Sequence, residues 1–181
     1  MDFNNFNFKS INPRELQGNV FELIGDKWML ITAAKDDGTT NTVNTMTASW
    51  GGMGIMWRKP VVSCVVRPVR YTYEFMEAAE YFTLSFFGEE YRDALNLLGK
   101  KSGRDGDKIK ESGLTPTSVS TPVTGCNAVC FTEADIVLVC KKIYYQDIDP
   151  ANFIDKDIDG HYPNKDYHRM YFGEITEVYM K

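Results

Sequence analysis

The sequence lacks a long apolar run and an excess of basic residues. No stretch of about 18 consecutive apolar residues occurs, so no membrane-spanning helix is predicted. Acidic residues outnumber basic ones and give a formal net charge of −5, whereas nucleic acids and anionic membranes attract basic surfaces. We therefore expect a protein that binds neither nucleic acid nor membranes.

The sequence also shows neither the pattern of a signal peptide at its beginning nor the paired cysteines of a zinc site, so we expect neither feature. The beginning, MDFNNFNFKS, has neither a basic segment nor an apolar stretch, which predicts a cytoplasmic protein. None of the four cysteines forms a C-x2-C pair, so no metal site is predicted from them. Free thiols are expected in the cytoplasm, and a disulfide between Cys126 and Cys130 is the alternative. The cysteines are Cys64, Cys126, Cys130 and Cys140.

What the sequence does contain is mostly β-strand pattern. Segments rich in β-branched and aromatic residues, separated by turn residues, are 28–35, 42–50, 61–67, 82–87, 128–145 and 167–179. Apolar residues at helical spacing predict short helices at 71–79 and 89–98, and a third follows Asp149-Pro150. With no repeat or linker, residues 1–181 are expected to form one domain, mainly β with short helices, folded as a closed or nearly closed antiparallel barrel.

The segment from Gly38 to Trp57 has no charged side chain, although 25% of the chain is charged. It offers hydroxyls, amides and glycines beside Trp50 and Trp57, but no acid or base. Shortly after it, Arg67 and Arg70 stand where an apolar strand ends and a helix is predicted to begin. A helix N-terminus and guanidinium groups favour an anion, so these residues predict a phosphate site.

Two features of this predicted phosphate site stay open. Thr47 and Ser49 complete it with hydroxyls if the neighbouring strand brings them close. The alternative is that Arg67 and Arg70 are surface residues that pair with acids such as Glu74. The glycine patterns of P-loops and of dinucleotide-binding folds are absent.

Several motifs follow one another along most of the chain: 44–51 (NTMTASWG), 59–60 (KP), 67–72 (RPVRYT), 82–85 (FTLS), 101–108 (KSGRDGDK), His168 and 172–175 (FGEI). In this order they resemble the flavin reductase-like FMN-binding proteins, and among them the flavoredoxin type. The resemblance implies a split β-barrel homodimer that binds FMN near the subunit interface. The residues that it places at the flavin or its phosphate are Met46, Thr47, Ala48, Ser49, Trp50, Arg67, Arg70, Tyr71, Thr72, Ser85, Ser102 and Lys108. A neutral, hydrogen-bonding strand at 44–51 suits a flavin ring.

Parts of the resemblance are open to another interpretation. The 101–108 loop, which includes Ser102 and Lys108, either folds toward the flavin or is a solvated helix end. Many relatives have asparagine at the position of Ser85. Reductases tend to show Gly-Asp-His where this chain has Asp166-Tyr167-His168, which argues against direct handling of nicotinamide. His168 is accordingly either a catalytic or substrate-facing residue or an ordinary buried histidine.

The expected function is that of an FMN-binding oxidoreductase or electron-transfer flavoprotein. The alternatives are an NAD(P)H-dependent flavin reductase and a non-enzymatic β-barrel binding module. No Ser/His/Asp arrangement or acid pair supports a hydrolase. The redox partner is not predicted by the sequence.

An acidic loop from Asp155 to Asp166 has part of the spacing of a calcium-binding EF-hand, with acids at 155, 157, 159 and 166. Pro163 falls inside the loop and no long helix precedes it. A turn-forming acidic loop is therefore favoured, and no metal is predicted.

Overall fold

The computed structural model describes residues 7–35, 42–120 and 127–181. Cys126, and with it the alternative disulfide, lies outside the described residues, as do the first residues of the charge-free segment. The other cysteines, Cys64, Cys130 and Cys140, are free and buried, and burial raises the pKa of each thiol.

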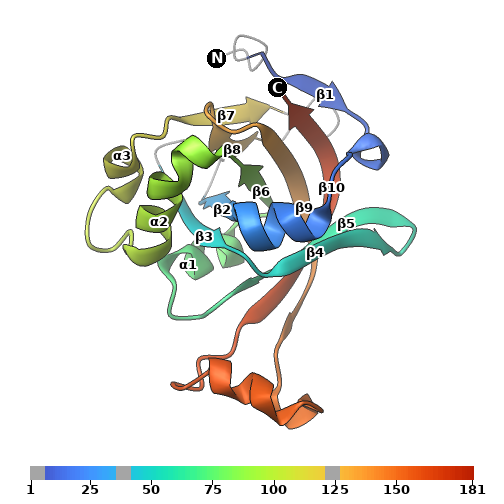
Figure 1. Cartoon of the computed structure of the whole chain (residues 1–181), viewed down its shortest axis with the longest axis vertical. Coiled ribbons are helices and arrows are strands. Elements are labelled where there is room, and N and C mark those ends of the chain that lie inside the picture. Colours follow the sequence, from blue (N-terminus) through green and yellow to red (C-terminus); the bar gives the residue numbers. More distant parts are fainter. Residues whose placement is uncertain (1–6, 36–41, 121–126) are drawn as a thin grey trace.

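The body of the molecule is one antiparallel sheet of eight strands in the order β3-β2-β6-β9-β10-β5-β4, with β1 paired to β10 (Figure 1). The strands are β1 (Lys9–Ile11), β2 (Met29–Ala34), β3 (Val43–Ala48), β4 (Gly51–Met56), β5 (Lys59–Val66), β6 (Tyr81–Phe86), β9 (Ile136–Asp147) and β10 (Arg169–Met180). A small separate sheet pairs β7 (Pro116–Ser120) with β8 (Asn127–Phe131).

The end strands of this order, β3 and β4, are separated in sequence only by Ser49 and Trp50. So short a connection keeps the two edge strands close, and the sheet therefore curls into an open barrel whose split lies at this connection. The mainly β barrel agrees with the sequence prediction.

Both faces of the central strands are buried, because successive side chains on a strand point to opposite faces. On β2, Met29 and Ile31 belong to the cluster inside the barrel, whereas Leu30 belongs to a second cluster. The second cluster includes Leu95 and Leu98 of a covering helix. Burial on both faces explains why these strands have continuous apolar runs.

The helices are short and lie around the barrel (Figure 1). They are α1 (Tyr71–Ala78), α2 (Arg92–Lys100), α3 (Lys108–Ser112), and the 3₁₀ or π turns η2 (Pro13–Glu15), η3 (Glu22–Lys27), η5 (Glu89–Tyr91), η6 (Pro150–Asn152) and η7 (Lys156–His161). The helices predicted at 71–79, at 89–98 and after Asp149-Pro150 are confirmed as α1, as η5 with α2, and as η6.

Several elements differ from the sequence prediction. The segment 128–145 is not one strand, because a turn in which Ala134 N–H donates to the Phe131 carbonyl divides β8 from β9. The glycine-rich strand β4 was not predicted, because its pattern is weak and its pairing with β5 depends on the turn between them. Trp57 and Arg58 in that turn both have positive φ, at 49° and 62°.

The hairpin of β9 and β10 carries an excursion, residues 148–168, which includes η6 and η7 and projects from the barrel at the bottom of Figure 1. Its return leg brings residues 161–168 back to the end of β5. In the part of the chain that the structure describes, no helix has the length and apolar character that crossing a bilayer requires.

Candidate functional site

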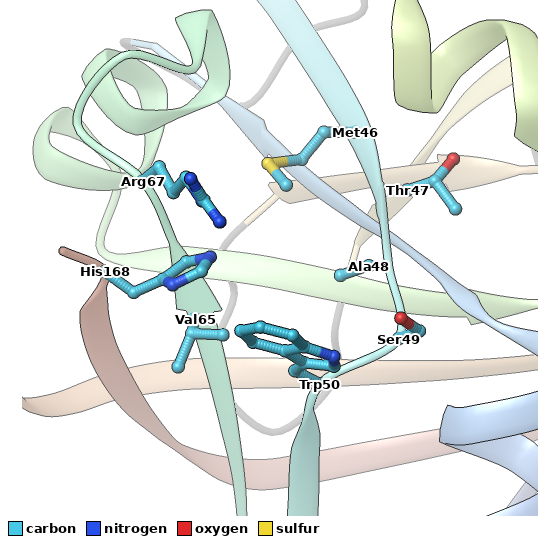
Figure 2. A pocket seen from close by; sticks show the side chains of 8 residues that line it. All are labelled: Met46, Thr47, Ala48, Ser49, Trp50, Val65, Arg67 and His168. Carbon is cyan, nitrogen blue, oxygen red and sulfur yellow. The ribbon is translucent and has the colours of Figure 1, made fainter. Parts of the chain in front are cut away.

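A pocket of about 180 Å³ lies at the split of the barrel, and we call it the split pocket (Figure 2). The end of β3 and the connection to β4 form one wall, while the end of β5 and the residue before β10 form the other. The lining residues are Met46, Thr47, Ala48, Ser49, Trp50, Val65, Arg67 and His168. The structure thus brings together seven residues that the sequence predicted and adds Val65.

Alternation along β3 decides which side chains face the split pocket. Met46 and Ala48 point toward its centre in Figure 2, whereas Thr47 points away from Arg67 and His168. The Thr47 hydroxyl donates instead to the Leu95 carbonyl of α2 at 2.5 Å. The expected pair of hydroxyls around Arg67 is therefore not formed, because strand geometry turns Thr47 to the helical side.

Arg67 is held by the excursion. Its Nη1 donates to both carboxylate oxygens of Asp166, at 3.0 and 3.1 Å, and its Nη2 donates to the His161 carbonyl at 2.9 Å. Burial tends to raise the pKa of Asp166, but the hydrogen bonds from Arg67 hold that pKa below its usual value. The guanidinium also lies over the ring of Tyr162, 5.1 Å from its centroid. Arg67 does pair with an acid, although the acid is not Glu74.

His168 lies beside Arg67 with only 8% of its surface exposed. Its Nδ1 is 2.9 Å from the hydroxyl of Tyr162, and its ring centroid is 5.3 Å from that of Trp50. Burial, and then the charge of Arg67, lowers the pKa of His168 to about 4. The imidazole is accordingly neutral near pH 7 and presents one donor and one acceptor nitrogen.

A second pocket, which we call the anion pocket, begins two residues beyond Arg67, at Val69. It lies at the N-terminus of α1, next to the 101–108 loop. The lining residues are Val69, Arg70, Tyr71, Thr72, Lys100, Lys101, Ser102 and Lys108. Arg70 is the N-cap of α1 and makes no side-chain capping bond, so the first N–H groups of the helix lack a side-chain acceptor. Arg67 and Arg70 thus belong to different pockets.

The anion pocket gathers the cations Arg70, Lys100, Lys101 and Lys108, of which Lys101 is paired with Glu111 at 2.6 Å. Lys108 is 3% exposed and donates to the carbonyls of Leu98 and Lys101, at 3.1 and 3.0 Å. Burial and the charge of Arg70 lower the pKa of Lys108 to about 8, and burial followed by the charge of Arg67 lowers the pKa of Arg70. Among the described residues, Arg70 has no carboxylate partner. This arrangement is electrostatically suited to a ligand with a terminal anionic group.

The 101–108 loop packs against the barrel at Gly103, while its residues 104–107 are exposed to solvent. Gly103 packs so closely that a Cβ there would lie 2.5 Å from Oδ1 of Asn44. The amide of Asn44 in turn donates to the hydroxyl of Thr72 at 2.9 Å. Only glycine permits this contact, which brings Ser102 and Lys108 to the start of α1.

Ser85 reaches neither pocket. It is fully buried on β6, opposite Leu30 of β2, which in turn lies opposite Thr47. Ser85 therefore shares the helical side of the sheet with Thr47, and its hydroxyl has no hydrogen-bond partner among the described residues.

The acids of the 155–166 loop have separate partners. Asp155 caps η7 by accepting from Asp157 N–H at 3.0 Å, and Asp159 accepts from Lys165 and Tyr167. Asp166 is bound to Arg67. Within residues 7–35, 42–120 and 127–181, no three His, Cys, Asp or Glu side chains are placed to hold a metal ion. The loop contains the 3₁₀ helix η7, which Asp155 caps.

The sequence did not identify the residues that contact Arg67 and His168 from outside the lining of the split pocket. Tyr162 and the Asp166–Arg67 pair were missed because their partners are distant in the chain; Arg67 and Asp166 are 99 positions apart. The one available signal was the presence of Asp166-Tyr167-His168 where reductases tend to show Gly-Asp-His.

This open barrel, with an anion pocket beside a pocket at its split, has known relatives. The family described as "Flavin reductase like domain" matches residues 23–181, and the chain belongs to this family. A comparison with curated protein sequences gave no match.

Solved structures share the fold. Flavoredoxin of Desulfovibrio vulgaris (Miyazaki F) has 22% identity and a TM-score of 0.64, over 96% of this chain and 76% of that one. The FMN-binding domain of a flavin reductases-like enzyme from Shewanella baltica OS155 has 16% identity and a TM-score of 0.62, over 96% and 76%. A flavin reductase-type structure from Shewanella frigidimarina NCIMB 400, described as having a split barrel domain, has 16% identity and a TM-score of 0.64, over 93% and 77%. The predicted split-barrel fold is confirmed.

Proposed function

We propose that this protein is a flavoprotein that binds FMN in the two pockets and transfers electrons through it. The observation that carries the proposal is the anion pocket, in which Arg70 and Lys108 lie near the N-terminus of α1 and neither is paired with a carboxylate of the described residues. Membership of the flavin reductase-like family and the FMN-binding relative from Shewanella baltica support it.

The residues present fit a flavin mononucleotide. The free N–H groups at the start of α1, Arg70, Lys108 and Ser102 would hold the terminal phosphate. The split pocket, with Met46, Ala48 and Val65, would hold the uncharged ring. The turn from Arg67 to Arg70, closed by an Arg70 N–H to Arg67 carbonyl bond of 3.0 Å, links the two pockets.

Bound FMN supplies the redox chemistry, because it takes up and releases electrons in pairs or singly. The chain contributes binding and orientation. Strand β3 and Trp50 would fix the ring in the split pocket, and the neutral His168 would offer a hydrogen bond from the ring nitrogen that Tyr162 does not contact. The absence of any further acid or base among the lining residues fits an electron-transfer role without a dedicated catalytic residue. An NAD(P)H-dependent flavin reductase is the second candidate, and His168 is the residue on which it would depend.

We also infer that the protein is a homodimer. Aromatic residues are exposed on the outer face of the barrel, where Trp57 contacts Tyr144 and Phe172 at centroid distances of 6.0 and 6.3 Å. Trp57 is 57% exposed and Tyr144 is 43% exposed. Trp50, at the split pocket, is also 43% exposed. A second copy would cover such surface, which is typical of interface cores.

The test is a titration of flavin-free protein with FMN, FAD and riboflavin, followed by flavin fluorescence and by calorimetry. Tight binding of FMN and much weaker binding of riboflavin are expected, because riboflavin has no phosphate for the anion pocket. For a variant of Lys108 in the same titration, Lys110→Ala is the matched control, since Lys110 is exposed on the same short helix as Lys108. Equal affinity for FMN and riboflavin would contradict the assignment of the anion pocket, and no binding of any flavin would contradict the proposed function.

A further inference from the structure

The Arg67–Asp166 pair lies at the wall of the split pocket and not in the anion pocket. Both carboxylate oxygens of Asp166 accept hydrogen bonds from the guanidinium. The side chain of Arg67 is 27% exposed and that of Asp166 is 12% exposed. Both bonds come from Nη1, while Nη2 is held by the His161 carbonyl, and the partly buried position reduces screening by solvent. The pair is therefore a fixed feature of the wall.

This pair balances the only formal charge in the lining of the split pocket. Arg67 is the only lining residue that carries a full charge, and Asp166 opposes it directly. His168, the other titratable lining residue, is held neutral by its burial. The remaining lining side chains are apolar, aromatic or hydroxyl-bearing. A compound that enters the pocket thus meets no net charge.

The exposed surface of the split pocket is partly aromatic. Trp50 presents its indole beside His168, as Figure 2 shows, and its other neighbour is His161 of the excursion, at a centroid distance of 5.4 Å. Flat rings with an uncharged polar group pack well on such surfaces.

We propose that Asp166 sets the charge selectivity of the split pocket: by balancing Arg67, it makes the pocket favour an uncharged, planar, conjugated ring compound and disfavour an anionic one. The proposal rests on the proposed function, since this compound would be the reaction partner of the flavin and would lie in the split pocket against the flavin ring that the same pocket holds. Without Asp166, the Arg67 guanidinium would face the pocket unpaired and attract carboxylates. Asp166 is thus a specificity-determining residue that acts through Arg67.

The experiment compares benzamide and benzoate, which have the same ring and nearly the same shape but differ in charge. Dissociation constants are measured at neutral pH with the FMN-bound protein, by the change in the flavin absorption spectrum. Calorimetry with the flavin-free protein gives a second, independent reading. If FMN does not bind, the proposed function fails, whereas the charge selectivity can still be measured by calorimetry.

We expect the original protein to bind benzamide about tenfold more tightly than benzoate. The carboxylate of benzoate would have no opposite charge in the balanced pocket, and one unbalanced charge at a partly buried site changes a dissociation constant by about this factor. Asp166→Asn should lower the benzoate-to-benzamide ratio of dissociation constants about tenfold, and Arg67→Gln should raise it. The double variant, Arg67→Gln with Asp166→Asn, should return the ratio to its original value because it is again balanced.

The double variant separates charge balance from a structural role of Asp166. If Asp166 only anchored the excursion, removing Arg67 as well would not restore selectivity. Asp155→Asn is the matched control, since Asp155 is an exposed acid of the same excursion outside the pocket, and it should leave the ratio unchanged. Equal binding of the two probes by the original protein, or a ratio that Asp166→Asn does not alter, would overturn the proposal. If Asp166→Asn does not fold, Arg67→Gln alone decides, and an unchanged ratio there refutes it.

Discussion

The charge of Lys108 predicts how flavin binding depends on pH. Without a ligand, burial and then Arg70 lower the pKa of Lys108 from its ordinary 10.5 to about 8. A phosphate group in the anion pocket would favour the charged ammonium and raise that pKa again. FMN binding should therefore take up a proton above about pH 8, so the affinity for FMN should fall as the pH rises through this value.

The size of the effect follows from the fraction of Lys108 that is charged. At pH 7 nearly every flavin-free molecule carries the ammonium, whereas at about pH 9.5 only about 3% do, which weakens FMN binding roughly 30-fold if the bound form stays protonated. The phosphate contributes little to this change, because its second pKa is near 6. Calorimetric titrations with FMN from pH 6 to about pH 10 measure the dependence.

Replacing Lys108 by methionine keeps most of the buried volume and removes the charge. At pH 7 the variant should bind FMN about 1.5 to 3 kcal/mol less tightly, the range for a hydrogen bond to a charged group. Its affinity should then be nearly independent of pH. Lys110→Met on the same helix is the control and should behave like the original protein. A Lys108→Met variant that keeps the full pH dependence would refute the reasoning.

Lys108 also affects the stability of the flavin-free protein, but the free energy of unfolding should rise with pH, whereas the affinity for FMN should fall. Its folded-state pKa lies below its unfolded-state value, so the unfolded chain binds the proton more tightly. The resulting loss of stability is present below about pH 8 and is relieved between about pH 8 and 10.5. The free energy of unfolding, measured with urea, should therefore rise over this window more in the original protein than in Lys108→Met.

The remaining predictions concern the other parts of the site. Arg70→Ala should weaken FMN binding by about 1.5 to 3 kcal/mol, the range for a hydrogen bond to a charged group. Arg67→Ala should weaken FMN binding clearly less, because the Arg67 guanidinium is already paired with Asp166. Equal losses of affinity in a titration would refute the division into two pockets. Sedimentation should show a dimer, and a monomer with full flavin content would contradict the inferred interface. Saturating calcium should leave the melting temperature unchanged, whereas a rise reversed by a chelator would reveal a site in the 155–166 loop. Mixing the FMN-bound protein with NADH or NADPH in a stopped-flow instrument should bleach the flavin slowly; rapid, saturable bleaching that is lost on replacement of His168 would favour a nicotinamide-dependent reductase.

The sequence by itself determined the local structure and most of the pocket residues. Alternating and helical apolar patterns depend on neighbouring residues only, so the strands from 61–67 and 82–87 and the helix at 71–79 were predictable. The uncharged segment up to Trp50 and the later Arg67 marked the two walls of the split pocket, and Arg70 marked the anion pocket. The order of short motifs indicated the family.

Only the tertiary structure decided which of those residues line each pocket and which partner neutralises the charge of Arg67. Side-chain direction on a strand is set by register against its neighbours, which is why Thr47 and Ser85 turn to the helical side while Met46 faces the pocket. The separation of Arg67 from Arg70 depends on a chain turn, and the neutralisation of Arg67 depends on Asp166, 99 positions away. Such long-range pairs arise when the barrel closes around its core, and no local pattern in the sequence records them.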